Sequence, residues 1–171
     1  TPFIDPFQGT VMANFAVKDL NAKTAVIYVD NSSDYSKGQS KTFEEVFTKA
    51  GGKIVGKESY LQKDTDYKSV LTKIKALNPD VVYIPGYYQE VSLIIKQSRE
   101  LGITAPLLGG DGWDSPQLFE VAGSALNNAY MSNHYSGGDN DAKVKAFEDK
   151  YEKKYGAKPE AFAALGYDSV M

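Results

Sequence analysis

Short apolar runs rich in β-branched residues recur along the chain at nearly even spacing. Five of them stand at residues 24–29, 53–56, 81–84, 106–108 and 129–131. Their starts lie 23 to 29 residues apart, and one strand with its crossover helix takes about 30 residues. Most runs are continuously apolar rather than alternating, as is typical of strands covered on both faces in a parallel sheet.

Amphipathic helical patterns fill the segments between these runs. Phe43, Phe47 and Ala50 share one helical face, and the Gly51-Gly52 pair that follows is a typical helix end. Helices are expected near residues 8–20, 43–50, 70–77, 91–101 and 144–154, and from 159 to the end of the chain. The alternation predicts a doubly wound α/β fold, an open and mainly parallel five-stranded sheet with helices on both faces. A length of 171 residues suits one domain, so we expect residues 1–171 to form a single α/β lobe.

Polar and aromatic residues follow the predicted strands where the chain leaves the sheet. Parallel strands end at the same edge, and ligands of open α/β sheets bind at that edge. The residues in question are 30–35, 85–88, 109–114 and 133–135. Tyr28 and Tyr83 lie inside the strands and are expected in the core, whereas Tyr35 and Tyr87 lie beyond strand ends and can face a ligand.

Asp111 stands on this rim between Gly110 and Gly112. Flanking glycines let a ligand or another backbone approach closely, and a carboxylate there can pair with a cationic group of a ligand. An aspartate that hydrogen-bonds its own turn is the alternative, and it is equally consistent with the residues. The pattern therefore leaves both interpretations of Asp111 open.

Composition narrows the chemistry that the chain can perform. Lys and Arg number 19 against 22 Asp and Glu, a net charge of −3 without the basic stripe of a nucleic-acid binder. Cysteine is absent, which excludes disulfides and thiolate chemistry, and no phosphate-binding glycine motif follows the first predicted strand. The one histidine, His134, offers an acid–base pair only with Asp111, so we expect no metal, no cofactor and no catalysis. Asp139 and Asp141 are expected to cap a helix rather than to bind calcium.

Four segments, taken together and in order, resemble one known family. They are residues 30–38, 82–90, 108–113 and 161–168. With them, the chain resembles the type I solute-binding proteins of ABC importers, in the branched-chain amino-acid (leucine, isoleucine and valine) subgroup. Members of that family have two α/β lobes that close on a ligand. The resemblance implies that this chain is the second lobe alone, a piece of a longer protein that ends before the return crossing.

The resemblance also implies roles for individual residues. The position of Asp111 is acidic in the family, often Glu, and pairs with the ammonium group of the ligand, although Asp is one methylene shorter. Tyr35 and Tyr87 match aromatic positions that line the pocket, and Phe162 matches another aromatic wall. Trp113 falls where the family varies and is a further candidate.

These likenesses imply a non-enzymatic protein that captures an aliphatic amino acid and delivers it to an ABC permease at the membrane. They also imply a monomer that acts outside the cytoplasm, either in a periplasm or as a cell-surface lipoprotein, with its signal segment outside this chain. The alternative is a regulatory sensor of the same fold that binds an amide or a nucleobase.

Overall fold

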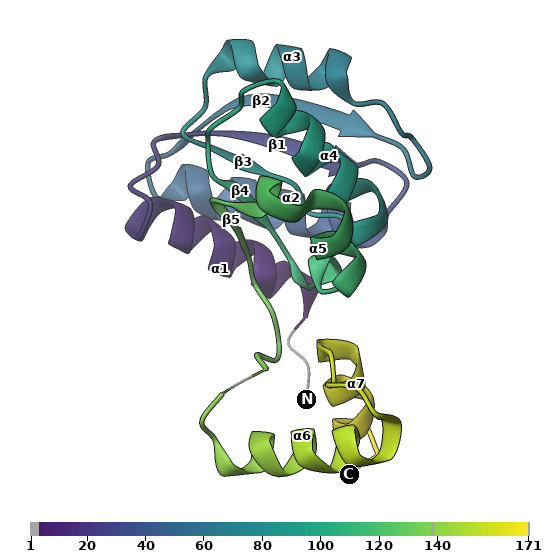
Figure 1. The fold of residues 1–171 in the computed structure, drawn as a ribbon. Helices are drawn as coiled ribbons and strands as arrows, with labels where there is room; N and C mark the ends of the chain where they lie inside the picture. The colour runs from purple at the N-terminus through teal and green to yellow at the C-terminus, as the bar shows by residue number, and fades with distance from the viewer. Residues whose placement is uncertain (1–3, 138, 171) are drawn as a thin grey trace. The chain divides into compact units, whose positions relative to one another are not determined.

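The computed structural model describes residues 4–137 and 139–170 (Figure 1). These residues form two compact units, residues 4–132 and the residues from 133 onward, and each unit is considered by itself. The prediction that residues 1–171 form a single lobe stays a prediction. Within the described residues, every helix is too short or too polar to cross a membrane.

The first unit is built on a five-stranded sheet in which every pair of neighbours is parallel. Its strands are β1 (Thr24–Asp30), β2 (Lys53–Tyr60), β3 (Val81–Tyr83), β4 (Leu107–Gly109) and β5 (Ala129–Met131), in the order β2-β1-β3-β4-β5. The strand order reverses direction at β1, so the carboxyl ends of β1 and β3 mark the switch point of the sheet. The predicted doubly wound, parallel α/β fold is confirmed.

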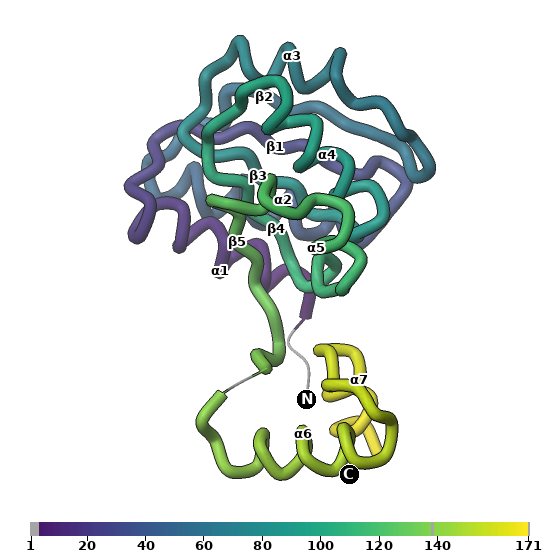
Figure 2. The backbone as a smooth tube through the Cα atoms, in the orientation of Figure 1, coloured from purple at the N-terminus to yellow at the C-terminus, as the bar shows by residue number. Residues whose placement is uncertain are grey.

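Helices cover both faces of this sheet, as the ribbon and the backbone tube show (Figure 1, Figure 2). One face carries α1 (Asp5–Lys18) and α2 (Asp34–Lys49), and the other carries α3 (Lys68–Leu77), α4 (Tyr88–Glu100) and α5 (Pro116–Ala122). Tyr83 of β3 points into the first of the two resulting cores and Tyr28 of β1 into the second. Both tyrosines are at most 1% exposed, so they are core residues as predicted.

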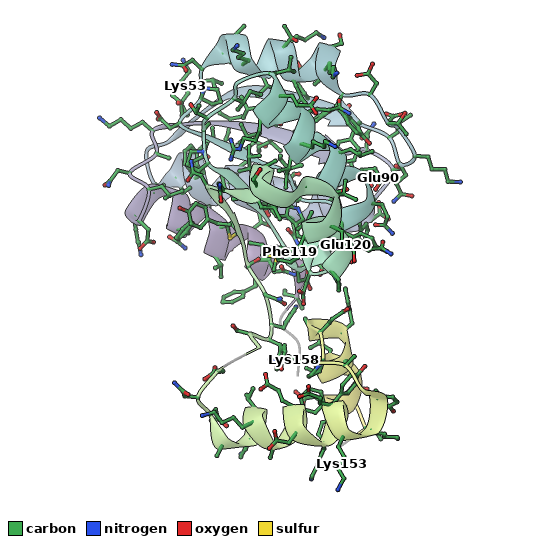
Figure 3. All side chains as sticks on the ribbon, in the orientation of Figure 1. Lys53, Glu90, Phe119, Glu120, Lys153 and Lys158 are labelled. Carbon is green, nitrogen blue, oxygen red and sulfur yellow. The ribbon has the colours of Figure 1, made fainter. Side chains whose placement is uncertain are left out.

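The segment after β4 departs from the predicted elements. It contains α5 and two 3₁₀ turns, η1 (Asp111–Trp113) and η2 (Gly123–Leu126). Helix α5 spans 7 residues and buries Leu118 and Ala122, a pattern too short to be recognised as a helical stripe. Phe119 on the same helix points outward and is 58% exposed (Figure 3).

Helix ends in the first unit follow from the chemistry of single residues. Ser33 caps α2, because its hydroxyl accepts a hydrogen bond from the Ser36 N–H at 3.3 Å. Asn78 ends α3 in the left-handed conformation, with a φ of 46°. Gly51 and Gly102 follow α2 and α4 with φ values of 92° and 78°, and Gly51 confirms the helix end predicted at the Gly51-Gly52 pair.

The second unit contains helices α6 (Ala142–Tyr155) and α7 (Ala161–Asp168) among its described residues. Asp141 caps α6 by accepting a hydrogen bond from the Lys143 N–H at 2.7 Å, which confirms the predicted cap. The prediction that the last helix runs to the end of the chain is wrong. Helix α7 ends at Asp168, and Ser169 follows as its C-cap, still in the right-handed helical conformation and with its hydroxyl donating to the Gly166 carbonyl at 2.7 Å.

Candidate functional site

Asp111 lies on the turn that follows β4, and it is 8% exposed. Its Oδ1 atom accepts hydrogen bonds from Nε2 of Gln8 and from the hydroxyl of Tyr35, each at 2.8 Å. Its backbone N–H donates to Oε1 of Gln8 at 2.9 Å. Gln8 belongs to α1 and Tyr35 to α2, so two helices that are distant in sequence orient this carboxylate.

Tyr35 holds the same turn at a second point. Its hydroxyl donates to the Asp111 carboxylate and accepts from the Gly112 N–H at 2.9 Å. Burial, followed by the charge of Asp111, raises the pKa of the Tyr35 hydroxyl well above its usual range. Tyr35 therefore stays a neutral hydrogen-bond donor at physiological pH.

The ring of Tyr87 stacks on the ring of Tyr35. The ring centroids are 5.0 Å apart and the planes differ by 20°. Tyr87 immediately precedes α4, whereas Tyr35 belongs to the first turn of α2, so the two rings come from the starts of the helices that follow β3 and β1 at the switch point. Burial, followed by the charges of Asp5 and Asp111, raises the pKa of the Tyr87 hydroxyl. The two rings form an aromatic surface next to the carboxylate.

Buried polar contacts join the ends of β1 and β3 and so position these tyrosines. The Ser36 hydroxyl accepts a hydrogen bond from the Asp30 N–H at 2.9 Å and donates to the carbonyl of Pro85. Ser36 directly follows Tyr35, and Pro85 lies two residues before Tyr87. The contact between the strand ends therefore also sets the separation of the two stacked rings.

Other groups of the protein approach the backbone closely at two glycines of the Asp111 turn. A Cβ atom on Gly110 would lie 2.7 Å from Oε1 of Gln39 and 2.8 Å from the Tyr35 hydroxyl. A Cβ atom on Gly112 would lie 2.6 Å from a backbone carbonyl oxygen at the end of β3. The close approach expected from the flanking glycines is made here by groups of the protein itself.

The structure brings Asp111, Tyr35 and Tyr87 together and buries Trp113 in the core of the same unit. Trp113 is 1% exposed in the core of the first unit, and its indole Nε1 donates to a backbone carbonyl at 3.1 Å. Phe162 lies on α7 of the second unit and is 55% exposed. The assignment of these five residues to a ligand site stays a prediction.

Two residues that complete the Asp111 cluster were not found from the sequence. Gln8 is fully buried, and Ser132, directly after β5, donates from its hydroxyl to Oε1 of Gln8 at 2.9 Å. One pattern could have indicated Gln8, which shares a helical face with the apolar Met12 and Ala16. A polar residue on a buried apolar face requires a hydrogen-bonding partner.

The remaining candidate chemistry concerns His134 and metals. His134 follows β5 in an irregular segment of the second unit, where it lines a cavity of about 560 Å³ together with Phe147 and Tyr167. Among the described residues, no group of three or more His, Cys, Asp and Glu side chains is placed so that it could hold a metal ion. The expectation that the protein is not an enzyme stays a prediction.

Comparison with known proteins places this arrangement in a family. A sequence model of the family described as "Periplasmic binding protein" matches residues 5–171. The chain belongs to the periplasmic binding protein family. The resemblance expected from the four sequence segments is therefore confirmed.

Solved structures match this periplasmic binding protein chain over nearly its whole length. The leucine binding protein LivK of Thermotoga maritima is 42% identical with a TM-score of 0.92, over 99% of this chain and 48% of that one. The branched-chain amino acid transporter substrate binding protein LivJ of Streptococcus pneumoniae, in complex with isoleucine, is 42% identical with a TM-score of 0.90, over 98% and 48%.

A curated relative of the periplasmic binding protein chain shows the same partial coverage. The Leu/Ile/Val-binding protein homolog 3 of Brucella melitensis is 28% identical over 166 residues, which are 97% of this chain and 44% of that protein. The chain thus spans about half the length of the relatives that it matches.

Proposed function

We propose that this chain belongs to the substrate-binding component of an ABC importer that captures a branched-chain or related aliphatic amino acid between two lobes and delivers it to a membrane permease. The observation that carries the proposal is the Asp111 carboxylate, which is almost buried at the switch-point edge and held by Gln8 and Tyr35 beside the stacked ring of Tyr87. The names of LivK and LivJ, each 42% identical to this chain, support the same ligand class.

Electrostatics explains why a carboxylate in this position suits an amino acid. The ligand is a zwitterion, so a protein that encloses it must supply a negative partner for the ammonium group and an apolar surface for the side chain. Asp111 supplies the first, and the rings of Tyr35 and Tyr87 contribute to the second. Closure of the other lobe of the proposed two-lobed protein over the site would exclude water. The attraction between Asp111 and the ammonium group would then strengthen, because the effective dielectric constant falls.

In this proposal the second lobe is the predicted single lobe of residues 1–171, although its described residues divide into two compact units. The residues from 133 onward form a separate compact unit. Helix α6 has no buried residue, and its Phe147 ring contacts the rings of Tyr135, Tyr151 and Tyr167 within the same unit, the last with the ring centroids 5.0 Å apart.

The same proposal covers the partners and the compartment. A substrate-binding component of an importer is not an enzyme, works outside the cytoplasmic membrane and docks on its permease as a monomer. Membership of the periplasmic binding protein family supports this assignment. Whether the complete protein is free or tethered as a lipoprotein depends on residues outside this chain.

Ligand-dependent melting of the complete two-lobed protein tests the proposed function. A ligand that binds only the folded state raises the melting temperature by mass action. We expect a rise with leucine, isoleucine or valine, and none with amides or nucleobases at the same concentration. A rise with amides or nucleobases alone would contradict the proposal and favour a regulatory sensor of the same fold.

A further inference from the structure

Gln8 of α1 joins two separate segments of the first unit, the turn after β4 and the residue after β5. Its side-chain amide donates from Nε2 to Oδ1 of Asp111 and accepts at Oε1 from the Asp111 N–H and from the Ser132 hydroxyl. The three distances are 2.8, 2.9 and 2.9 Å, and the Gln8 side chain is fully buried. Such a group is costly to bury unless it is fully paired, and here the pairing explains its presence on an apolar helix face.

Backbone N–H groups, which can only donate, determine which atom donates and which accepts in each hydrogen bond of this cluster. A backbone N–H only donates, so the Asp111 N–H requires Oε1 of Gln8 to face it, and Nε2 must then face Oδ1 of Asp111. The Gly112 N–H likewise donates to the Tyr35 hydroxyl, whose own proton is left for the same Oδ1 atom. Oδ1 of Asp111 therefore has to act as an acceptor.

Gln8 also occupies a special place along the chain. It lies four residues after Ile4, the first residue of the first unit, and Ser132 is the last residue of that unit. Asp111 follows β4, and Ser132 follows its neighbour β5, to which β4 is paired. One amide thus links the carboxylate with the places where the chain enters and leaves the unit.

We propose that Gln8 is a positioning residue that determines which ligands the site accepts, because it holds the Asp111 carboxylate as an acceptor toward the ligand and anchors it to Ser132. The ligand must then present a hydrogen-bond donor to Asp111, and a ligand without one is rejected. This inference rests on the proposed function. It adds Gln8, which is not one of the stacked tyrosines, as a residue that controls discrimination between an amino acid and the corresponding carboxylic acid.

The test measures discrimination rather than affinity alone. Dissociation constants for leucine and for 4-methylpentanoate, which has the same side chain and carboxylate but no ammonium group, are determined calorimetrically for the complete protein and for Gln8→Met. Methionine matches the length of glutamine but cannot donate to Asp111. We expect the Kd for leucine to rise about 10- to 100-fold, the usual effect of losing a buried hydrogen bond to a charged group, and the Kd for 4-methylpentanoate to change much less.

The matched control is Asn14→Met, which removes a side-chain amide from the same helix. The Asn14 amide donates to the Thr10 carbonyl at 3.0 Å and not to the Asp111 cluster. We expect this variant to discriminate between the two compounds as the wild-type protein does. Equal weakening of both compounds in Gln8→Met would indicate a purely structural role and overturn the proposal.

Gln8→Glu provides a second variant in case Gln8→Met does not fold. A protonated glutamic acid has the shape of glutamine and can still donate to Asp111, whereas the ionised form faces a second carboxylate. The Tyr35 hydroxyl donates to Asp111, whereas the Tyr83 hydroxyl donates to Oε1 of Gln39. Burial and the charge of Asp111 raise the pKa values of Tyr35, Tyr83 and Tyr87, so these hydroxyls do not titrate near neutrality. We expect near wild-type leucine affinity at about pH 6 and a loss at about pH 8.5, against an unchanged wild type.

The outcomes separate this inference from the function on which it rests. A wild-type protein that binds leucine no better than 4-methylpentanoate overturns both. The role of Gln8 is overturned, and the proposed function is left standing, if the wild type discriminates between the two compounds and Gln8→Met does so equally well. The same conclusion follows if the wild type discriminates and leucine binding by Gln8→Glu does not depend on pH.

Discussion

The Tyr35 hydroxyl lies 2.8 Å from Oδ1 of Asp111 and at the same time accepts the Gly112 N–H at 2.9 Å. A residue at the start of α2 therefore holds both the side chain and the backbone of the turn after β4. Because β1 and β4 lie on either side of β3, this contact spans the carboxyl edge of the sheet at its switch point.

Removal of the Tyr35 hydroxyl should weaken ligand binding while the aromatic stack remains. Tyr35→Phe leaves the ring available to stack on Tyr87 but takes one donor from Asp111 and one acceptor from the Gly112 N–H. We expect a loss of about 1–3 kcal/mol in leucine binding by calorimetry, as is usual for a hydrogen bond to a charged group. The control is Tyr88→Phe, which removes the hydroxyl of the tyrosine that directly follows Tyr87 in the sequence. Equal leucine affinity of the two variants would contradict the role assigned to the Tyr35 hydroxyl.

Substitution of Gly110 should disturb the same turn by steric means. A Cβ atom there would lie within 2.8 Å of both Gln39 Oε1 and the Tyr35 hydroxyl, so Gly110→Ala is expected to lower the free energy of unfolding by about 1–3 kcal/mol. Gly38→Ala is the matched control, because nothing lies within 4 Å of the added atom on helix α2. Chemical denaturation measures both variants. Equal stability of Gly110→Ala and Gly38→Ala would show that the turn adapts without cost.

Asp80, at the amino ends of β1 and β3, is expected to make a pH-dependent contribution to the stability of the fold. Its Oδ2 atom accepts from the Lys23 and Thr24 N–H groups, each at 2.8 Å, and these bonds lower the pKa of the Asp80 carboxyl. A carboxyl whose pKa is lower in the folded than in the unfolded protein stabilises the fold at pH values above its unfolded pKa. This stabilisation disappears as the pH falls through the folded pKa.

The variant Asp80→Asn measures that contribution. We expect it to be less stable than the wild type by about 1 kcal/mol at pH 7, the usual net size of a hydrogen bond, and the difference to shrink on acidification below the usual aspartate range. Denaturation at several pH values checks this, with leucine affinity expected to stay unchanged. A stability difference that grows on acidification would contradict the sign of the pKa shift.

The layered fold could be predicted from the chain because its central strands are short and continuously apolar. Residues 81–84 and 107–108 are buried, and the interval between such runs leaves room for one helix. Helix α5 escaped prediction because its 7 residues bury only two side chains, which is too few to define a period. The end of α7 escaped prediction because no glycine or proline marks it and Ser169, which follows the helix, keeps helical dihedral angles.

The candidate site could be predicted only in part, since its contacts cross long sequence separations. The positions of Tyr35, Tyr87 and Asp111 at strand ends were sufficient to place them on one rim. Gln8 lies 103 residues from Asp111 and 124 from Ser132, and no local pattern reveals such pairings. The burial of Trp113 likewise depends on the turn η1, which the glycines around it do not specify.

The central claim is that the charge of Asp111 holds the ammonium group of an amino acid, and calorimetry of Asp111→Asn in the complete protein tests it most directly. An asparagine oxygen can still accept from Gln8 and Tyr35, so the turn is preserved while the charge is removed. Asp34→Asn, a change at an exposed carboxylate of α2, is the control. We predict that Asp111→Asn loses about 2–5 kcal/mol of leucine binding, the usual effect of breaking a buried charged pair. Unchanged affinity in Asp111→Asn would contradict the account.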